Sequence, residues 1–191
     1  MRLAFKEWAI IVDALGRGEQ ILILRKGGLQ EGASGFRVEH PQFLLLPTRY
    51  HQQREAVVDS AQARFDEIAL GFPPDGRIRV EFSADVVDCR RLDQLTDAAR
   101  LRGQHIWRDD VIEQRFDWGR EKEIHALAVR VWRLPQGVEL PLLPSYAGCK
   151  SWVELERDID TRGAAPVLDD ASFGLKLNRL HAALAGAGAP A

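Results

Sequence analysis

Two runs of apolar residues in the first third of the chain are each followed directly by a cluster of polar residues. The run at 21–24 leads into a basic, glycine-rich turn at 25–28, and the run at 43–46 leads into the polar segment 48–54. Continuous aliphatic runs of this length are typical of strands that are buried on both faces. We therefore predict two strands that deliver basic, amide and glycine residues to one edge of a sheet, where many proteins bind anions.

The spacing of apolar residues predicts the remaining elements. Helical spacing predicts helices over 4–15, 55–70, 92–101, 109–116, 151–159 and 173–184, and aliphatic or alternating runs predict strands over 20–24, 36–38, 42–46, 77–82 and 124–134. A strand competes with the first helix, because the β-branched residues 10–12 favour extended structure. If the polar segment 48–54 is the solvated N-terminus of the helix over 55–70, Thr48 is its cap. We expect Ser151 with Glu154 to form a capping box that opens the helix over 151–159. The turn at 135–137 is expected to end the strand before it.

Helices interleaved with strands predict an α+β fold, a single compact domain with a mixed or curved β-sheet flanked by helices. We place this domain at residues 1–160. Residues 161–191 are expected to add a C-terminal helix and a flexible tail of Ala, Gly and Pro, packed on the domain or extending from it. A chain of 191 residues with 46% hydrophobic residues is large enough to build one hydrophobic core.

Charge and cysteine content narrow the classes of function. The net charge of −2 excludes a global field that would draw the protein onto nucleic acid or anionic membranes. Basic charge is concentrated instead, because the segment 25–54 contains five Lys or Arg residues and two Glu residues. Cys89 and Cys149 lie far apart, so we expect reduced thiols, no metal site and no cofactor. The chain shows no membrane-span run and no signal-peptide layout, which predicts a cytoplasmic protein without a membrane partner.

Four sequence blocks resemble a known family. These blocks are KEWAIIVDALGRGEQILILRKGG, FRVEHPQFLLLPT with the following His51-Gln52, RVWRLP, and YAGCKSWVEL. Together they resemble the bacterial domain-of-unknown-function family 1802 over nearly the whole chain up to about Ile159. The resemblance implies no catalytic residue. Some relatives are associated with restriction-endonuclease-type domains, which implies a connection with nucleic acid.

A second, partial resemblance lies around the first predicted strand. Gly18 and Arg25 have the separation of the first and last residues in the GxKxxExR signature of the ASCH group of PUA-like domains, which are associated with RNA binding. Gln20 stands where that signature has lysine, and Ile23 stands where it has glutamate. The resemblance therefore bears on the fold and not on an activity.

The segment 25–54 contains the candidate ligand-binding residues, which we call the basic rim. Guanidinium and ammonium groups bind phosphate, glycine leaves backbone N–H groups accessible, and a tyrosine or histidine ring can stack on a base. The basic rim consists of Arg25, Lys26, Gly27, Gly28, Arg37, Arg49, Tyr50, His51 and Arg54. A charged turn and a solvated helix N-terminus would account for the same residues without a ligand.

Several functional hypotheses follow. The first is a module that binds RNA, single-stranded nucleic acid or phosphate through the basic rim. The second is an enzyme that acts on a small phosphorylated or nucleotide substrate, with His51 or His40 as acid or base and the arginines as a clamp. The third is a protein-interaction domain without a small-ligand site. No nucleophile, carboxylate-pair or metal pattern is complete, so the sequence leaves open whether the protein is an enzyme. It also leaves the oligomeric state open.

Overall fold

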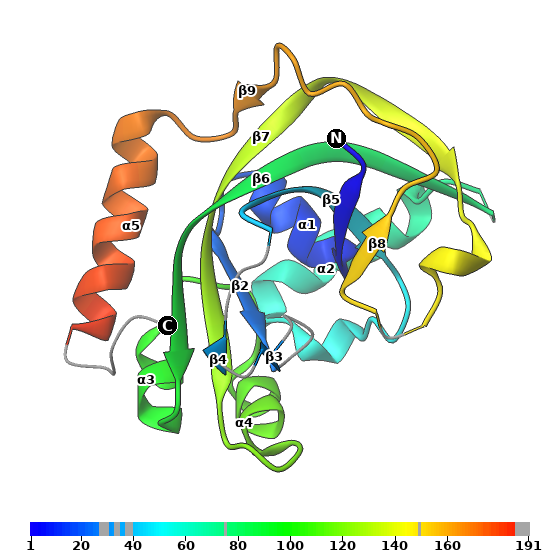
Figure 1. Ribbon diagram of the computed structural model, residues 1–191. Coiled ribbons are helices and arrows are strands. Elements are labelled where there is room, and N and C mark those ends of the chain that lie inside the picture. Colours follow the sequence, from blue (N-terminus) through cyan, green and yellow to red (C-terminus); the bar gives the residue numbers. More distant parts are fainter. Residues whose placement is uncertain (27–30, 33–34, 37–39, 75, 149, 186–191) are drawn as a thin grey trace.

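A mixed β-sheet forms the centre of the computed structural model (Figure 1), which describes residues 1–26, 31–32, 35–36, 40–74, 76–148 and 150–185. The strands of the sheet are β1 (Leu3–Trp8), β2 (Leu22–Arg25), β5 (Gln42–Thr48), β6 (Arg77–Leu92), β7 (Ile124–Pro141), β8 (Trp152–Glu154) and β9 (Ala165–Pro166). In the described part of the chain they join in the order β2-β7-β6-β5-β1-β8, and β9 pairs with β7. A separate strand pair consists of β3 (Glu31–Gly32) and β4 (Gly35–Phe36).

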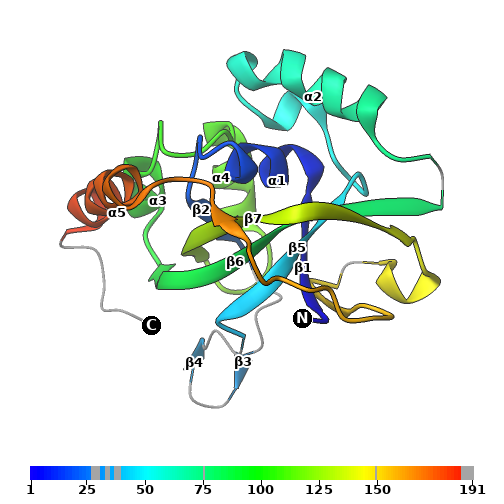
Figure 2. The ribbon, with the colours of Figure 1, turned by 90° about the horizontal axis from the view of Figure 1, so that it is seen from above.

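Helices lie on this sheet in two groups. They are α1 (Ala9–Gly16), α2 (Asp59–Gly71), α3 (Leu95–Arg100), α4 (Asp109–Asp117) and α5 (Asp170–Leu184), with 3₁₀ turns η1 (Arg54–Ala56) and η2 (Pro144–Tyr146). Helices α1 and α2 pack together, whereas α5 lies beside α3 at the far end of the sheet (Figures 1 and 2). The α+β class, with a mixed sheet, flanking helices and a C-terminal helix, is thus confirmed.

The strand β5 is buried on both faces. Phe43 and Leu45 pack in the larger hydrophobic core, while Leu44 and Leu46 pack in a second core on the opposite face. All four side chains have 0% exposed area, which explains the continuous apolar run. β5 runs parallel to β1, and the other pairings in the described sheet are antiparallel. The carboxyl ends of β1 and β5 therefore meet at the same edge.

The long strands β6 and β7 bend over the other elements (Figure 1). Their register shifts where Phe82 pairs with Arg133 and Val80 pairs with Val138, so four residues of β7 stand opposite one residue of β6. Such a bulge bends a strand and increases its twist. The predicted turn at 135–137 is this bulge, and β7 continues through it to Pro141, so the expected strand end was wrong.

The helix predicted over 151–159 is wrong, and the helix predicted over 4–15 is wrong in its first part, because distant strands pair with those segments. Residues 3–8 form β1 and only residues 9–16 form a helix, since β1 lies between β5 and β8. The segment expected to open a helix with a capping box instead contains the strand β8, in which Glu154 pairs with Leu3 and Trp152 with Phe5. Backbone pairing with a buried strand outweighs a local capping signal, because it satisfies the same polar groups over several residues.

The start of α2 also differs from the prediction. The helix begins at Asp59 with Val58 at its N-cap, and Thr48 does not cap it. Thr48 instead accepts a hydrogen bond from the backbone N–H of Tyr50 (3.1 Å), which begins a turn directly after β5. The other predicted helices and strands are found close to their expected positions, except that 37–38 of the strand over 36–38 lie outside the described residues.

The C-terminal helix packs against the sheet. Phe173, Leu180 and Leu184 of α5 belong to the larger hydrophobic core, together with side chains of the sheet. Helix α5 therefore shares a hydrophobic core with the sheet. Residues 186–191 of the expected tail lie outside the described residues.

Candidate functional site

Strand β1 separates two polar regions, one on each face of the sheet. Lys6 lies on the face of Ala4 and the second core, and it lines a pocket. Glu7 lies on the opposite face with Phe5, where the guanidinium of Arg25 contacts both residues. Alternation along the strand therefore places an ammonium group in one region and a buried carboxylate in the other.

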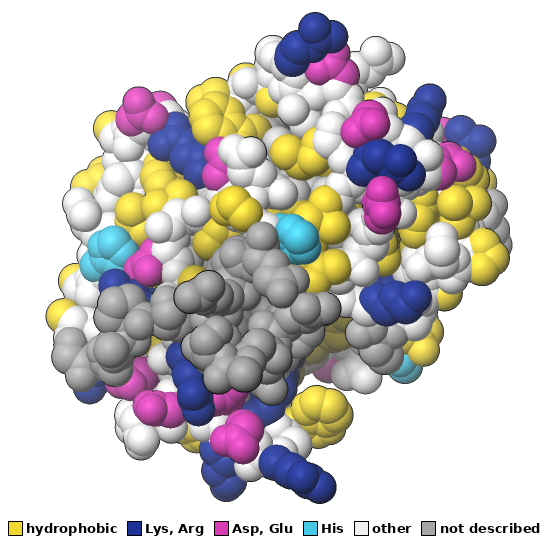
Figure 3. Space-filling model, in the orientation of Figure 1, with side chains coloured by type: hydrophobic (Ala, Val, Ile, Leu, Met, Phe, Trp, Pro, Cys, Tyr) yellow, Lys and Arg dark blue, Asp and Glu magenta, His cyan; other side chains and the backbone are white. Residues whose placement is uncertain are grey.

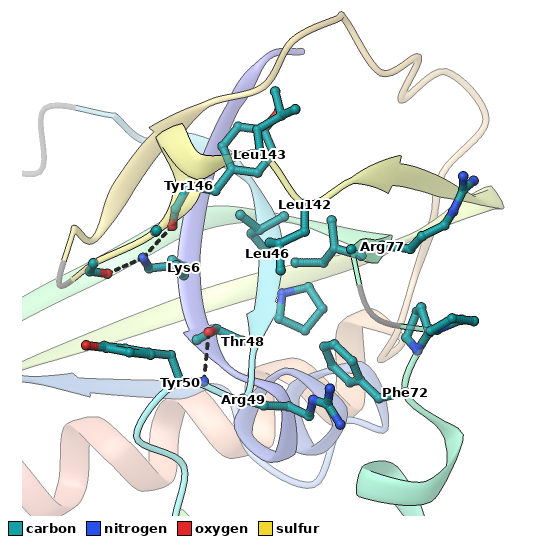
Figure 4. Close-up of a pocket in the computed structure, with 17 residues that line it drawn as sticks. Lys6, Leu46, Thr48, Arg49, Tyr50, Phe72, Arg77, Leu142, Leu143 and Tyr146 are labelled. Atoms are coloured by element: carbon teal, nitrogen blue, oxygen red, sulfur yellow. Dashed lines mark hydrogen bonds between the residues drawn. The ribbon is translucent and has the colours of Figure 1, made fainter.

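The first region is a cavity of about 310 Å³, which we call the β1–β5 pocket (Figure 4). It lies at the carboxyl ends of these two strands and is closed by the segment before β6 and by η2. Its walls are mainly apolar, with basic and aromatic side chains among them, and no Asp or Glu occurs among the described residues that line it. The lining residues include Lys6, Leu46, Thr48, Arg49, Tyr50, Phe72, Arg77, Ile78, Leu142, Leu143 and Tyr146.

Lys6 brings a positive charge to the wall of the pocket. Its side chain is 9% exposed, and its Nζ donates to the backbone carbonyls of Tyr146 (2.7 Å) and Gly148. A buried ammonium group is stable only when its N–H groups are hydrogen-bonded. These carbonyls, which belong to η2 and the segment after it, therefore fix the position of the Lys6 ammonium group, as Figure 4 shows.

Arg49 lines the same pocket in a defined orientation. Its guanidinium carbon lies 4.6 Å from the centre of the Phe72 ring, a cation–π contact that restricts the side chain. Arg77 also lines the pocket, but its guanidinium points away in Figure 4 and pairs with Glu139 (3.4 Å). Arg49 is therefore the guanidinium best placed to contact a ligand in this pocket.

The segment after β5 folds into a turn that presents two rings. The backbone N–H of Gln52 donates to the carbonyl of Arg49 (3.1 Å), and His51 has a φ of 58°, which is uncommon for residues other than glycine. The rings of Tyr50 and His51 are 3.9 Å apart, and Tyr50 is 53% exposed. The side-chain oxygen of Gln52 accepts from the backbone N–H of Ile10 (3.1 Å), which anchors the turn to the start of α1.

The second polar region, the Arg25 cluster, comprises Arg25, Glu7, Ser151 and Arg115. Arg25 donates to Ser151 Oγ (2.7 Å) and to Glu7 Oε2 (3.4 Å), and Glu7 is only 3% exposed. Strand β2 carries Arg25 at one end of the strand order, whereas Glu7 and Ser151 lie on or beside the two strands at the other end. Arg25 thus connects the two ends of the curved sheet.

Arg115 completes this cluster from helix α4. Its guanidinium carbon lies 3.7 Å from the centre of the Trp107 ring, and its Nη1 donates to the carbonyl of Leu24 (3.4 Å). Burial lowers the pKa of Arg115 to about 10, while the charge of Glu7 opposes this shift and that of Arg25 adds to it. The sequence analysis missed Glu7, Ser151 and Arg115, because only the tertiary structure brings them next to Arg25.

The other cations of the basic rim also have partners within the protein. Lys26 Nζ donates to the carbonyls of Phe116 (2.8 Å), Glu121 and Glu123 (3.0 Å), which join the end of α4 to β7. Arg54 Nε lies 3.0 Å from the carboxylate oxygens of Asp66 on α2. Gly27, Gly28 and Arg37 lie outside the described residues. The structure therefore brings Arg49, Tyr50 and His51 together and places Arg25, Lys26 and Arg54 in three separate surroundings.

The two histidines suggested for acid–base chemistry lie in different environments. His40 precedes β5 and packs its ring against Trp152, with 5.1 Å between the ring centres, whereas His51 follows β5 beside Tyr50. Among the described residues, no group of three or more His, Cys, Asp or Glu is arranged to hold a metal ion. The same residues contain no helix that is both long and apolar enough to cross a membrane.

The model of the family described as a domain of unknown function, DUF1802, matches residues 4–179. The chain belongs to this family. The family predicted from the four sequence blocks is thus confirmed, and it carries no description of an activity. No curated protein matches the chain.

Solved structures of an ASCH protein from Zymomonas mobilis are similar to this chain. One is 12% identical, covers 92% of this chain and 92% of its own, and has a TM-score of 0.47. A mutant of that protein is 11% identical, covers 93% of this chain and 94% of its own, and has a TM-score of 0.48. They carry the name of the group that the GxKxxExR-like segment resembles.

Proposed function

We propose that this protein binds a phosphorylated ligand that also carries a ring, with RNA or single-stranded DNA as the main candidates, and that the β1–β5 pocket is the binding site. The observation that supports this proposal is that Lys6 and Arg49 line the same apolar cavity as Tyr50 and Phe72. Cations stabilise phosphate, and aromatic or apolar walls stabilise a base by stacking and burial. One pocket therefore offers both interactions that a nucleotide needs.

The position of the pocket in the fold supports the same conclusion. It lies outside the carboxyl ends of β1 and β5, which run parallel. In sheets with parallel strands, ligands often bind at such ends, because the residues that follow the strands converge there. Arg49 and Tyr50 of the basic rim line this pocket and are part of the proposal, whereas His51, Arg25, Lys26 and Arg54 are not among the residues that line it.

The experiment is fluorescence anisotropy of labelled single- and double-stranded RNA and DNA against purified, nuclease-treated protein across a salt series. Replacing Arg49 by alanine removes one charge-assisted contact, worth about 1.5–3 kcal/mol, so binding should weaken roughly 10- to 150-fold. The matched control is Arg162→Ala, because Arg162 is an exposed arginine that pairs with Asp160 and does not line the pocket.

Two results would overturn this proposal. In the first, the wild-type protein binds neither nucleic acid nor any phosphorylated small molecule at low salt. In the second, Arg49→Ala and Arg162→Ala weaken binding equally, which would show that the interaction is only a general effect of charge. Thermal unfolding of both variants verifies that a loss of binding is not a loss of folding.

A further inference from the structure

We propose that the β1–β5 pocket accepts a single nucleotide unit, one base with its phosphate, and not an extended strand. This inference rests on the proposed function and adds the class of ligand and the mode of recognition. The unit can be a free mononucleotide or the terminal nucleotide of a strand, because both present the same chemistry. The size of the pocket, its charge and the orientation of Arg49 each support it.

The volume of the pocket fits one ring and one phosphate. At about 310 Å³, it lies near the lower end of the range of small-molecule sites, roughly 300–1,000 Å³. Ile78, Leu142 and Phe72 form apolar wall, and Leu142 and Leu143 lie across the pocket from Thr48 and Arg49 in Figure 4. A second stacked base would have to lie outside this cavity.

The charges around the pocket indicate a contact with only one phosphate. The described residues that line it include three cations, Lys6, Arg49 and Arg77, and Arg77 also pairs with Glu139. On the face shown in Figure 3, Lys and Arg side chains are interspersed with Asp and Glu and do not form a continuous stripe. A strand that runs over a protein surface needs a groove of cations along its backbone. The described cations on the face in Figure 3 do not form such a groove, which favours a pocket for one phosphate.

The contact between Arg49 and Phe72 makes the phosphate position specific. Because the guanidinium carbon lies 4.6 Å from the ring centre, the cation–π contact restricts the position of the planar guanidinium before any ligand arrives. Replacing Arg49 by lysine keeps the charge and removes both the stack and the planar arrangement of donors. Replacing Phe72 by leucine keeps an apolar wall and removes only the stack. Both variants should bind nucleotides about 3- to 10-fold more weakly, whereas Arg162→Ala should not.

The salt dependence of the binding constant distinguishes binding of one phosphate in the pocket from binding of a strand along the basic rim. The slope of log K against log salt is about −0.7 for each phosphate neutralised in a single strand. One phosphate therefore predicts a slope of about −0.7, whereas contacts from all five cations of the basic rim predict about −3.5. This difference is large enough to measure by anisotropy.

The test is competition against a labelled oligonucleotide by inorganic phosphate, nucleosides, nucleoside monophosphates and unlabelled strands of increasing length. We expect nucleoside monophosphates to compete completely, affinity to be independent of strand length, and the salt slope to be shallow. Strands with a 5′-phosphate, a 3′-phosphate or only hydroxyl ends distinguish the source of the ligand. A preference for one phosphorylated end supports recognition of a terminal nucleotide, and tighter binding of free monophosphates than of any strand supports a mononucleotide.

The variant Tyr50→Leu tests the contribution of the ring. Because Tyr50 lines the pocket and is half-exposed, its loss should weaken nucleotide binding several-fold and leave binding of inorganic phosphate unchanged. Affinity that rises with strand length, together with a steep salt slope, would overturn the inference and leave the proposed function in place. If inorganic phosphate binds as tightly as any nucleotide, the ring contributes nothing, and both the inference and the ring-binding part of the proposed function fail. If no phosphorylated compound binds, the proposed function itself fails.

Discussion

Arg25 connects the two ends of the curved sheet, so its loss should destabilise the protein. Arg25 on β2 donates to Ser151 Oγ (2.7 Å) and contacts the buried carboxylate of Glu7 on β1 (3.4 Å). The perturbation that isolates this contact is Arg25→Ala. It removes a cation that is 23% exposed and leaves a carboxylate with 3% exposed area beside the vacated space. The proposed ligand pocket lies on the other face of β1.

The size of the effect follows from these contacts. A hydrogen bond from a charged donor, such as that to Ser151, contributes about 1.5–3 kcal/mol. Removing one partner of a buried ion pair costs about 3–5 kcal/mol, because the other charge stays buried. Glu7 still accepts from the backbone N–H of Trp8 (2.7 Å), and Arg25 is partly exposed, which places the total at the lower end of this range. We expect a loss of about 3 kcal/mol in the free energy of unfolding.

Thermal and urea unfolding followed by circular dichroism measure this loss. For a chain of 191 residues, about 3 kcal/mol corresponds to a fall in Tm of roughly 6–12 °C. The matched control is Arg17→Ala, because Arg17 forms an ion pair with Glu19 in which both side chains are about half-exposed. Such surface pairs contribute about 0–1 kcal/mol, so the control should leave Tm nearly unchanged.

A double-mutant cycle with Glu7→Gln tests the reasoning itself. If the buried carboxylate causes the loss, Arg25→Ala should cost less in the Glu7→Gln background, with a coupling energy of about 1–3 kcal/mol. An unchanged Tm for Arg25→Ala, combined with a loss of ligand binding, would refute the structural role. Arg25 would then be a ligand residue, as the basic rim predicted. A fall in Tm without coupling to Glu7 would refute the ion-pair explanation.

Two further predictions concern packing and pH. A Cβ at Gly16 would lie 2.2 Å from Phe82 Cζ, so Gly16→Ala should lower the free energy of unfolding by about 1–3 kcal/mol. In α5, a Cβ at Gly174 would have no atom within 4 Å, so Gly174→Ala should raise it by about 0.5–1 kcal/mol. Urea unfolding compares the two variants, and equal effects would contradict the predicted clash. Burial lowers the pKa of His105 from 6.5 to about 4, so the unfolded chain binds a proton that the folded protein excludes. The stability linked to His105 is therefore present above pH 6.5 and lost as the pH falls toward 4, by up to about 3 kcal/mol. The variant His105→Gln should lose less stability than the wild type between these pH values, and an identical pH profile would count against this assignment.

The sequence alone located the elements whose apolar pattern reflects burial. The runs at 21–24 and 43–46 predicted two buried strands, and helical spacing predicted the C-terminal helix α5. These predictions succeeded because periodicity and continuous apolar runs are set by how much of each segment is buried. The position of Arg49 and Tyr50 after a buried strand followed in the same way, since residues beyond a strand end lie at the edge of the sheet.

Tertiary structure determined the secondary structure and the contacts wherever a local sequence signal conflicted with pairing to a distant segment. The first part of the helix predicted over 4–15 belongs to β1, because β5 and β8 pair with this strand on either side. The grouping of the basic rim was also beyond the sequence, since it depends on which carbonyl or carboxylate each cation meets. Lys26 donates hydrogen bonds to three carbonyls around the end of α4, and Arg25 donates one to Glu7 across the sheet. Arg49 forms a cation–π contact with the ring of Phe72. A sequence determines which residues carry charge, but only the fold determines whether a charge faces the protein or a ligand, because its partners come from segments far away in the chain.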